Sequence, residues 1–133
     1  MLVQRFMEAT AIALGLVALT LLFAPELVLV RIAIDPVRAL LPLAQLYGAA
    51  LFGLAMTTWM ARTMLLGGIY GKAIVTGGFA HSFSGAFVLV HALRATPSNA
   101  LLWGAFALYV IVASGFGILM FGSGPASPNA STS

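Results

Sequence analysis

KAIVTGGFAHSFSGAFVLVHALR, residues 72–94, is the stretch that decides the fold, because 21 uncharged residues lie between Lys72 and Arg94. A transmembrane helix needs about 20 consecutive apolar residues, and Lys and Arg are common at the ends of such a span. Three other apolar stretches are of similar length. We therefore predict four membrane-spanning helices, over residues 6–23, 43–61, 73–93 and 100–121.

The composition of the 133-residue chain supports a membrane protein. Hydrophobic residues make up 62% of the chain and charged residues 7%, whereas a soluble domain carries roughly a quarter charged residues. Six basic and three acidic side chains are too few to make the surface of a soluble protein hydrophilic or to form a nucleic-acid-binding patch. The chain has no Cys, which excludes a disulfide scaffold and thiolate metal sites.

The predicted fold class is all-α, an antiparallel four-helix membrane bundle formed by one domain over residues 1–121. Barrel strands alternate apolar and polar residues over about 10 positions, and these stretches do not. The connector after the first span contains Asp35-Pro36, which is typical of a helix start. We expect the apolar segment from Leu27 to Ile34 to lie at the membrane interface. The loop over 62–72 is glycine-rich and expected to be flexible, and the uncharged polar tail over 122–133 is expected to be disordered.

The orientation in the membrane is harder to predict, since the basic residues near the spans divide three against three between the two sides. Arg5 precedes the first span, which usually dominates orientation. Arg31 and Arg38 share their loop with Glu26 and Asp35. We therefore expect both termini to be cytoplasmic, in a bacterial inner membrane, with the lipid bilayer as the main partner and no nucleic-acid partner.

His81 is the most informative single residue, because it is predicted near the centre of the third span, where an ionisable side chain is costly. At 100° per residue it shares one helix face with small and polar neighbours, and Phe79, Phe83 and Phe87 fall on the other side. One interpretation is a structural hydrogen bond to a Ser, a Thr, Gln45 or Tyr109. The other is a ligand or proton site. The residues on the face of His81 are Gly77, Gly78, Ser82, Ser84 and Gly85.

The second span has a similar face of small residues, which predicts close packing against the third span. Small residues allow helix backbones to approach one another, and Ala49 and Gly53 have the four-residue spacing of such contacts. Gln45 lies on the same face and is expected either to bond across helices or to contact a ligand. The packing residues that we predict are Gly48, Ala49, Gly53, Gly77, Gly78 and Gly85.

No cofactor and no metal site is predicted. His81 and His91 are ten residues apart on one helix, roughly 15 Å along its axis, so a single haem could not be ligated by both. Glu8 stands early in the first span. One interpretation is that its negative charge interacts favourably with the positive end of the helix dipole. The other is that it acts as the transport carboxylate, because the chain resembles the small four-helix multidrug-resistance transporters, which are built around such a Glu.

The first half of the chain resembles a known group of proteins. Phe23-Ala24-Pro25-Glu26, then Asp35-Pro36, then the stretch from Leu46 to Gly53, LYGAALFG, are similar to the small bacterial four-helix proteins of the DUF4345 family, within the DoxX-like set. The resemblance implies a membrane bundle and carries no catalytic residues over to this chain.

Two functions remain open from the sequence. The first is a non-enzymatic membrane protein, either an accessory subunit of a larger complex or a binder of a lipid or quinone-like hydrophobic ligand. The second is a small proton-coupled transporter that acts as a dimer through Glu8 or His81. The candidate ligand or proton site comprises His81, Gln45, Glu8, Ser82 and Tyr109.

Overall fold

The computed structural model describes residues 1–32, 40–63 and 69–122, and this part of the chain consists of helices joined by turns, without strands. Four of its helices are long and apolar enough to cross a membrane, which confirms the all-α class and the four candidate spans. The helices are α1 (Leu2–Phe23), α2 (Pro25–Arg31), α3 (Leu41–Ala61), α4 (Ile69–Ala95) and α5 (Ala100–Gly122).

The helices begin and end close to the predicted spans, with two extensions. α1 begins at Leu2 and α4 runs from Ile69 to Ala95, because a helix can continue into the polar flanks of its apolar part. Lys72, which we expected in a loop, therefore lies in the first turns of α4. Asp35-Pro36 and the tail from residue 123 onward lie outside the described residues.

The break between α1 and α2 follows from proline chemistry. Pro25 has no backbone N–H to continue the hydrogen bonds of α1, and it is tolerated in the first turn of a new helix. Ala24 leaves the helical conformation, with φ −139° and ψ 53°, while its N–H still bonds to the carbonyl of Thr20 at 2.8 Å. The seven-residue α2 occupies part of the segment that was expected at the membrane interface.

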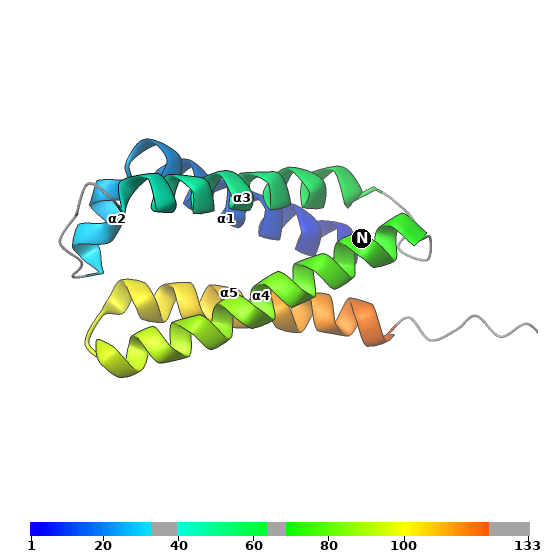
Figure 1. Cartoon of the computed structure of the whole chain (residues 1–133). Helices are drawn as coiled ribbons and strands as arrows, with labels where there is room; N and C mark the ends of the chain where they lie inside the picture. Colours follow the sequence, from blue (N-terminus) through cyan, green and yellow to red (C-terminus); the bar gives the residue numbers. More distant parts are fainter. Residues whose placement is uncertain (33–39, 64–68, 123–133) are drawn as a thin grey trace, which may run out of the picture.

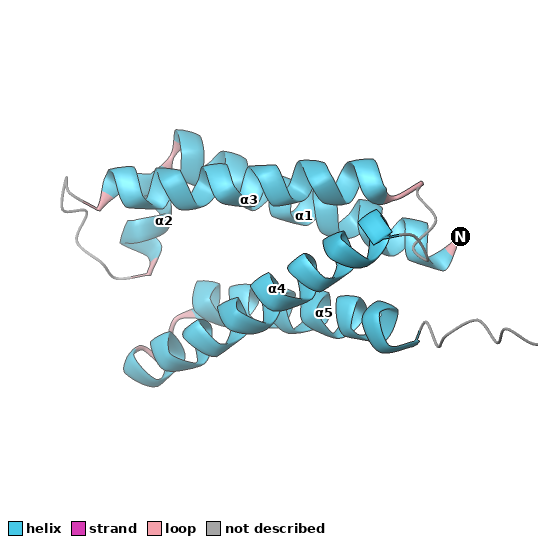
Figure 2. Cartoon of the chain, turned by 45° about the vertical axis from the view of Figure 1, so that its right-hand side comes forward, coloured by secondary structure: helices cyan, strands magenta, loops and turns pink. Residues whose placement is uncertain are grey.

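The four long helices form two pairs, with α1 along α3 and α4 along α5 (Figures 1 and 2). α2 and the turn between α4 and α5 lie at one end of the molecule. The start of α1, the end of α3 and the start of α4 lie at the other end. Gly48, which we predicted to pack α3 against α4, faces α1 instead. A Cβ built at Gly48 would lie 2.9 Å from the Cβ of Leu21 and 3.0 Å from the carbonyl oxygen of Ala18.

Two apolar clusters hold these pairs together. The first, which we call the four-helix core, takes residues from every long helix: Met7, Ala61, Val75, Val112 and Phe116. The other, the α1–α3 core, comprises Leu14, Ala18, Leu21, Leu51 and Ala55. The two helix pairs are thus joined by apolar packing at the end where α1 begins.

The predicted packing glycines divide into two groups. Gly78 lies against the ring of Phe116, and Gly85 lies against the ring of Tyr109, so both allow α4 to approach α5 closely. Gly53 and Gly77 differ from the prediction, since an added Cβ at either would meet no atom within 4 Å. Both lie on exposed sides of their helices, as does Ala49. Helical periodicity identifies a face of small residues but does not say which helix, if any, covers it.

The aromatic stripe of α4 behaves partly as expected. Phe83 and Phe87 are 58% and 65% exposed, in keeping with a lipid-facing side. Phe79 is only partly exposed, because it packs against the four-helix core and meets Phe121 edge to face, with ring centroids 6.2 Å apart.

Candidate functional site

Three polar rings from three helices meet between the two helix pairs, and we call them the Tyr47–His81–Tyr109 cluster. The Tyr109 hydroxyl on α5 is hydrogen-bonded to the Tyr47 hydroxyl on α3 and lies 3.3 Å from His81 Nε2 on α4. The Tyr47 and His81 rings are stacked, with centroids 6.4 Å apart and planes inclined by 23°. The His81 and Tyr109 rings are tilted by 40°, with centroids 5.7 Å apart.

The cluster is assembled around Tyr109, its most buried member. The Tyr109 side chain is 7% exposed and passes over Gly85 of α4, where any Cβ would overlap the ring. This glycine therefore brings the Tyr109 hydroxyl within reach of His81, one turn earlier on the same helix. His81 is half-buried, and Tyr47 is 44% exposed, so the cluster is open on one side.

Of the predicted site residues, the structure brings only His81 and Tyr109 together. The Ser82 hydroxyl is buried and donates to the carbonyl of Gly78, one turn back in its own helix, at 2.8 Å. The Gln45 amide donates to the carbonyl of Leu22 at 3.2 Å, which links α3 to the end of α1. Neither side chain belongs to the cluster.

Tyr47 is the cluster member that the sequence analysis does not single out. It lies only six residues after Leu41, the first residue of α3, and aromatic residues near span ends are common at that depth. Its partners are 34 and 62 residues away along the chain. No local spacing signals that pairing, since it depends on how the helix pairs dock.

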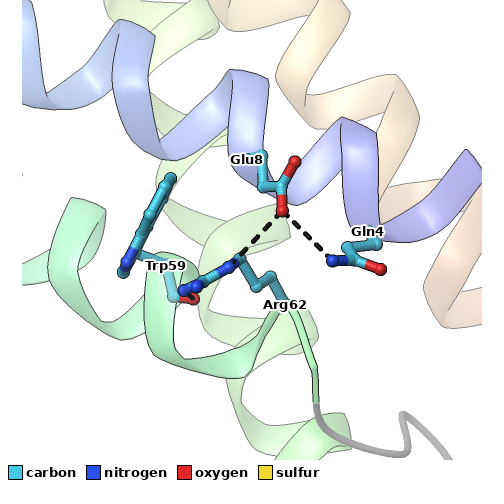
Figure 3. A network of polar contacts seen from close by, with 4 residues as sticks. All are labelled: Gln4, Glu8, Trp59 and Arg62. Carbon is cyan, nitrogen blue, oxygen red and sulfur yellow. Dashed lines mark hydrogen bonds and ion pairs between the residues drawn. The ribbon is translucent and has the colours of Figure 1, made fainter. Parts of the chain in front are cut away.

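Glu8 lies in a separate polar network at the start of α1 (Figure 3). Its carboxylate is 3.4 Å from the Arg62 Nε atom and accepts a hydrogen bond from Gln4 Nε2 at 3.2 Å. The Arg62 guanidinium also donates to the carbonyl of Trp59 at 2.7 Å and lies over the Trp59 ring, 4.0 Å from its centroid. The network ties the start of α1 to the residue that follows α3.

Asn99 organises the end of the molecule near α2. Its side-chain oxygen caps α5 by accepting from the backbone N–H groups of Leu101 and Leu102 at 3.0 and 3.2 Å. Its amide nitrogen donates to the carbonyl of Arg31 at 2.7 Å. An open depression of about 300 Å³ lies here, lined by Arg31, Ser98, Asn99, Ala100 and Leu101.

The described residues contain no group of three His, Asp or Glu side chains that could hold a metal ion. Comparisons of the chain with protein-family models, with curated proteins and with solved structures found no match. The resemblance to the DUF4345 and DoxX-like proteins therefore stays a prediction.

Proposed function

We propose that the chain is an integral protein of a bacterial inner membrane whose long helices form an antiparallel four-helix bundle. At 1.5 Å per residue, helices of 21 to 27 residues are about 32–40 Å long, enough to cross a hydrocarbon core of about 30 Å. α2 is proposed to lie at the interface, because it exposes Leu27 and Val30 beside the charged Glu26 and Arg31. Both termini are placed on the cytoplasmic side.

Within this bundle, we propose that the protein binds a hydrophobic ligand with a polar head group at the Tyr47–His81–Tyr109 cluster. The observation that carries the proposal is the meeting of three hydrogen-bonding rings from three helices, two of which are not fully buried. Polar groups at membrane depth are costly unless they find partners. A lipid or a quinone-like molecule has an apolar body for the bilayer and a polar end for such a cluster.

This binding role is that of a non-enzymatic protein, acting by itself or as an accessory subunit of a larger membrane complex. The alternative of a proton-coupled transporter has less support at Glu8. That carboxylate already has Arg62 and Gln4 as partners, at the far end of the helices from α2, and it takes no part in the cluster.

Organic extraction and mass spectrometry of the protein purified in mild detergent would test the binding role. We expect a hydrophobic compound to co-purify with the native chain and to be depleted from the Tyr47→Phe/His81→Leu/Tyr109→Phe variant. Phe83→Leu, on the exposed side of α4, is the matched control and should retain the compound. Identical extracts from all three proteins, with the variant shown to be folded by circular dichroism, would refute the proposed function.

A further inference from the structure

The Tyr47–His81–Tyr109 cluster has one more hydrogen-bond donor than it can use internally. Each tyrosine hydroxyl carries one proton, and a neutral imidazole carries one N–H, which makes three donors. The cluster contains two internal hydrogen bonds, Tyr47 to Tyr109 and Tyr109 to His81. Each bond uses one donor, so one donor is always left over. A protonated imidazole would add a further donor and would not remove the excess.

The position of the spare donor depends on the direction of the hydrogen bonds, because Tyr109 has a single proton to give. If Tyr109 donates to His81 Nε2, Tyr47 must donate to Tyr109, and the spare donor is the Nδ1–H of His81. If His81 Nε2–H donates to Tyr109, there are two possibilities, because a hydroxyl can accept two hydrogen bonds: Tyr109 donates to Tyr47 and the spare donor is the Tyr47 hydroxyl, or Tyr47 also donates to Tyr109 and the spare donor is the Tyr109 hydroxyl. In every arrangement the spare donor belongs to one of the three rings of the cluster.

The protein itself offers no acceptor for this proton within the part of the chain that the structure describes. There, the Tyr47 hydroxyl bonds only to Tyr109, and the His81 ring makes no hydrogen bond other than the one through Nε2. The Tyr109 hydroxyl likewise bonds only to Tyr47 and His81, and no backbone carbonyl of the described residues accepts from any of the three rings. In folded proteins, buried donors without a partner are rarer than buried acceptors without one, which indicates that an unpaired donor is the more costly of the two.

We infer that the cluster selects a hydrophobic molecule that brings a hydrogen-bond acceptor, most simply a carbonyl oxygen, into the hydrocarbon core. One carbonyl oxygen accepts a hydrogen bond from the spare donor in every arrangement and leaves no donor without a partner. This inference rests on the proposed ligand-binding function and adds the chemical class of the head group. A head group that only donates would leave the spare proton without a partner.

The depth of the cluster in the membrane favours a carbonyl group located in the hydrocarbon core over the ester carbonyl of a phospholipid. His81 lies roughly 18 Å along α4 from Ile69 and roughly 21 Å from Ala95, so it sits near the middle of a core about 30 Å thick. Ester carbonyls lie at the edge of the core. We therefore assign the site to a separate carbonyl-bearing molecule, such as a long-chain ketone or a quinone.

The test compares 2-tetradecanone with tetradecane, which share chain length and differ in the carbonyl. Radiolabelled probes are partitioned between empty nanodiscs of ether-linked phospholipids and nanodiscs that hold the full-length protein. We expect the protein to retain the ketone about five- to tenfold better than the alkane, as for one net hydrogen bond. The infrared band of a ¹³C-labelled ketone carbonyl should also shift to lower frequency in the presence of the protein.

The variants follow from the count of donors. Tyr109→Phe breaks both internal bonds and leaves two spare donors, on Tyr47 and His81, so the preference for the ketone should persist. The Tyr47→Phe/His81→Leu/Tyr109→Phe variant has no donor and should lose the preference. Tyr70→Phe, at the exposed start of α4, is the matched control and should behave as the native chain.

The outcomes separate the inference from the proposed function. Equal retention of ketone and alkane would overturn the carbonyl inference and leave a hydrophobic site in place. Retention of neither probe, together with unchanged extracts, would overturn both. Loss of the preference in Tyr109→Phe would also overturn the inference, since it contradicts the donor count. Loss of the preference in nanodiscs of ester-linked lipids would overturn it as well, since it identifies the lipid as the occupant. Persistence in both would support it.

Discussion

Replacing Gly78 by alanine should leave the bundle less stable than the same change at the adjacent Gly77. An ideal Cβ at Gly78 would lie 2.6 Å from Cε2 and 2.7 Å from Cζ of Phe116, closer than carbon atoms can pack. Phe116 is fully buried and cannot move aside freely, because Phe6 meets it edge to face with ring centroids 5.5 Å apart. A Cβ at Gly77 would meet no atom within 4 Å.

The magnitude follows from comparing the two variants. Both glycines lie inside α4, so each alanine gains about 1 kcal/mol of helix propensity, and this gain cancels in the difference. What remains is the cost of adding a methyl group to a filled core, typically about 1–3 kcal/mol. We therefore expect Gly77→Ala to be neutral or stabilising, and Gly78→Ala to be less stable than Gly77→Ala by about 1–3 kcal/mol.

Reversible unfolding in mixed detergent micelles, followed by circular dichroism, would measure the two free energies of unfolding. Gly53→Ala, on the open side of α3, is a second control and should behave like Gly77→Ala. A Gly78→Ala protein as stable as Gly77→Ala would show that α4 does not approach Phe116 in the way described. The rotation of α4 against α5 would then have to be revised.

Three further outcomes are expected. The coupling free energy between Glu8 and Arg62, from a double-mutant cycle on unfolding, should be about 1 kcal/mol or less, since both side chains are about one-third exposed (34% and 27%); a coupling of several kcal/mol would contradict this. Asn99→Ala should lower the free energy of unfolding by about 1 kcal/mol through loss of the α5 cap, and Asn99→Asp should retain most of it. Cysteines placed at Thr63 and Ser98 should react with an impermeant maleimide from opposite sides of the membrane, and labelling from one side would remove the antiparallel bundle.

The number and kind of long helices could be predicted from the sequence, because lipid imposes a simple rule on length and composition. Any run of about 20 apolar residues must form a helix that satisfies its own backbone. The pairing of those helices could not be predicted. Gly48 and Gly53 lie on one predicted face of α3, yet only Gly48 is covered, by α1. Both glycines look alike in sequence, and the difference arises from where the neighbouring helix crosses.

The candidate site was predictable to the extent that it depends on depth. His81 stood out because an ionisable group in mid-span needs a partner, and Tyr109 was among the partners considered. Tyr47 could not be found in this way, since tyrosine near a span end is already explained by the interface. The partner of Glu8 could not be predicted either, because Arg62 lies 54 residues away along the chain.

The two helix pairs are joined differently at their two ends, and the cluster lies on the side where the joint is polar. Apolar packing around Phe116 unites all four long helices where α1 begins. Toward α2, among the residues that the structure describes, Tyr47 is hydrogen-bonded to Tyr109 across the two pairs, and Asn99 donates to the carbonyl of Arg31 at the end of α2. Hydrogen bonds between membrane helices average about 0.6 kcal/mol, far less than a buried aromatic core contributes. The cluster thus contributes little to holding the two helix pairs together. A ligand that accepts a hydrogen bond from its spare donor would strengthen the weaker of the two contacts between the pairs.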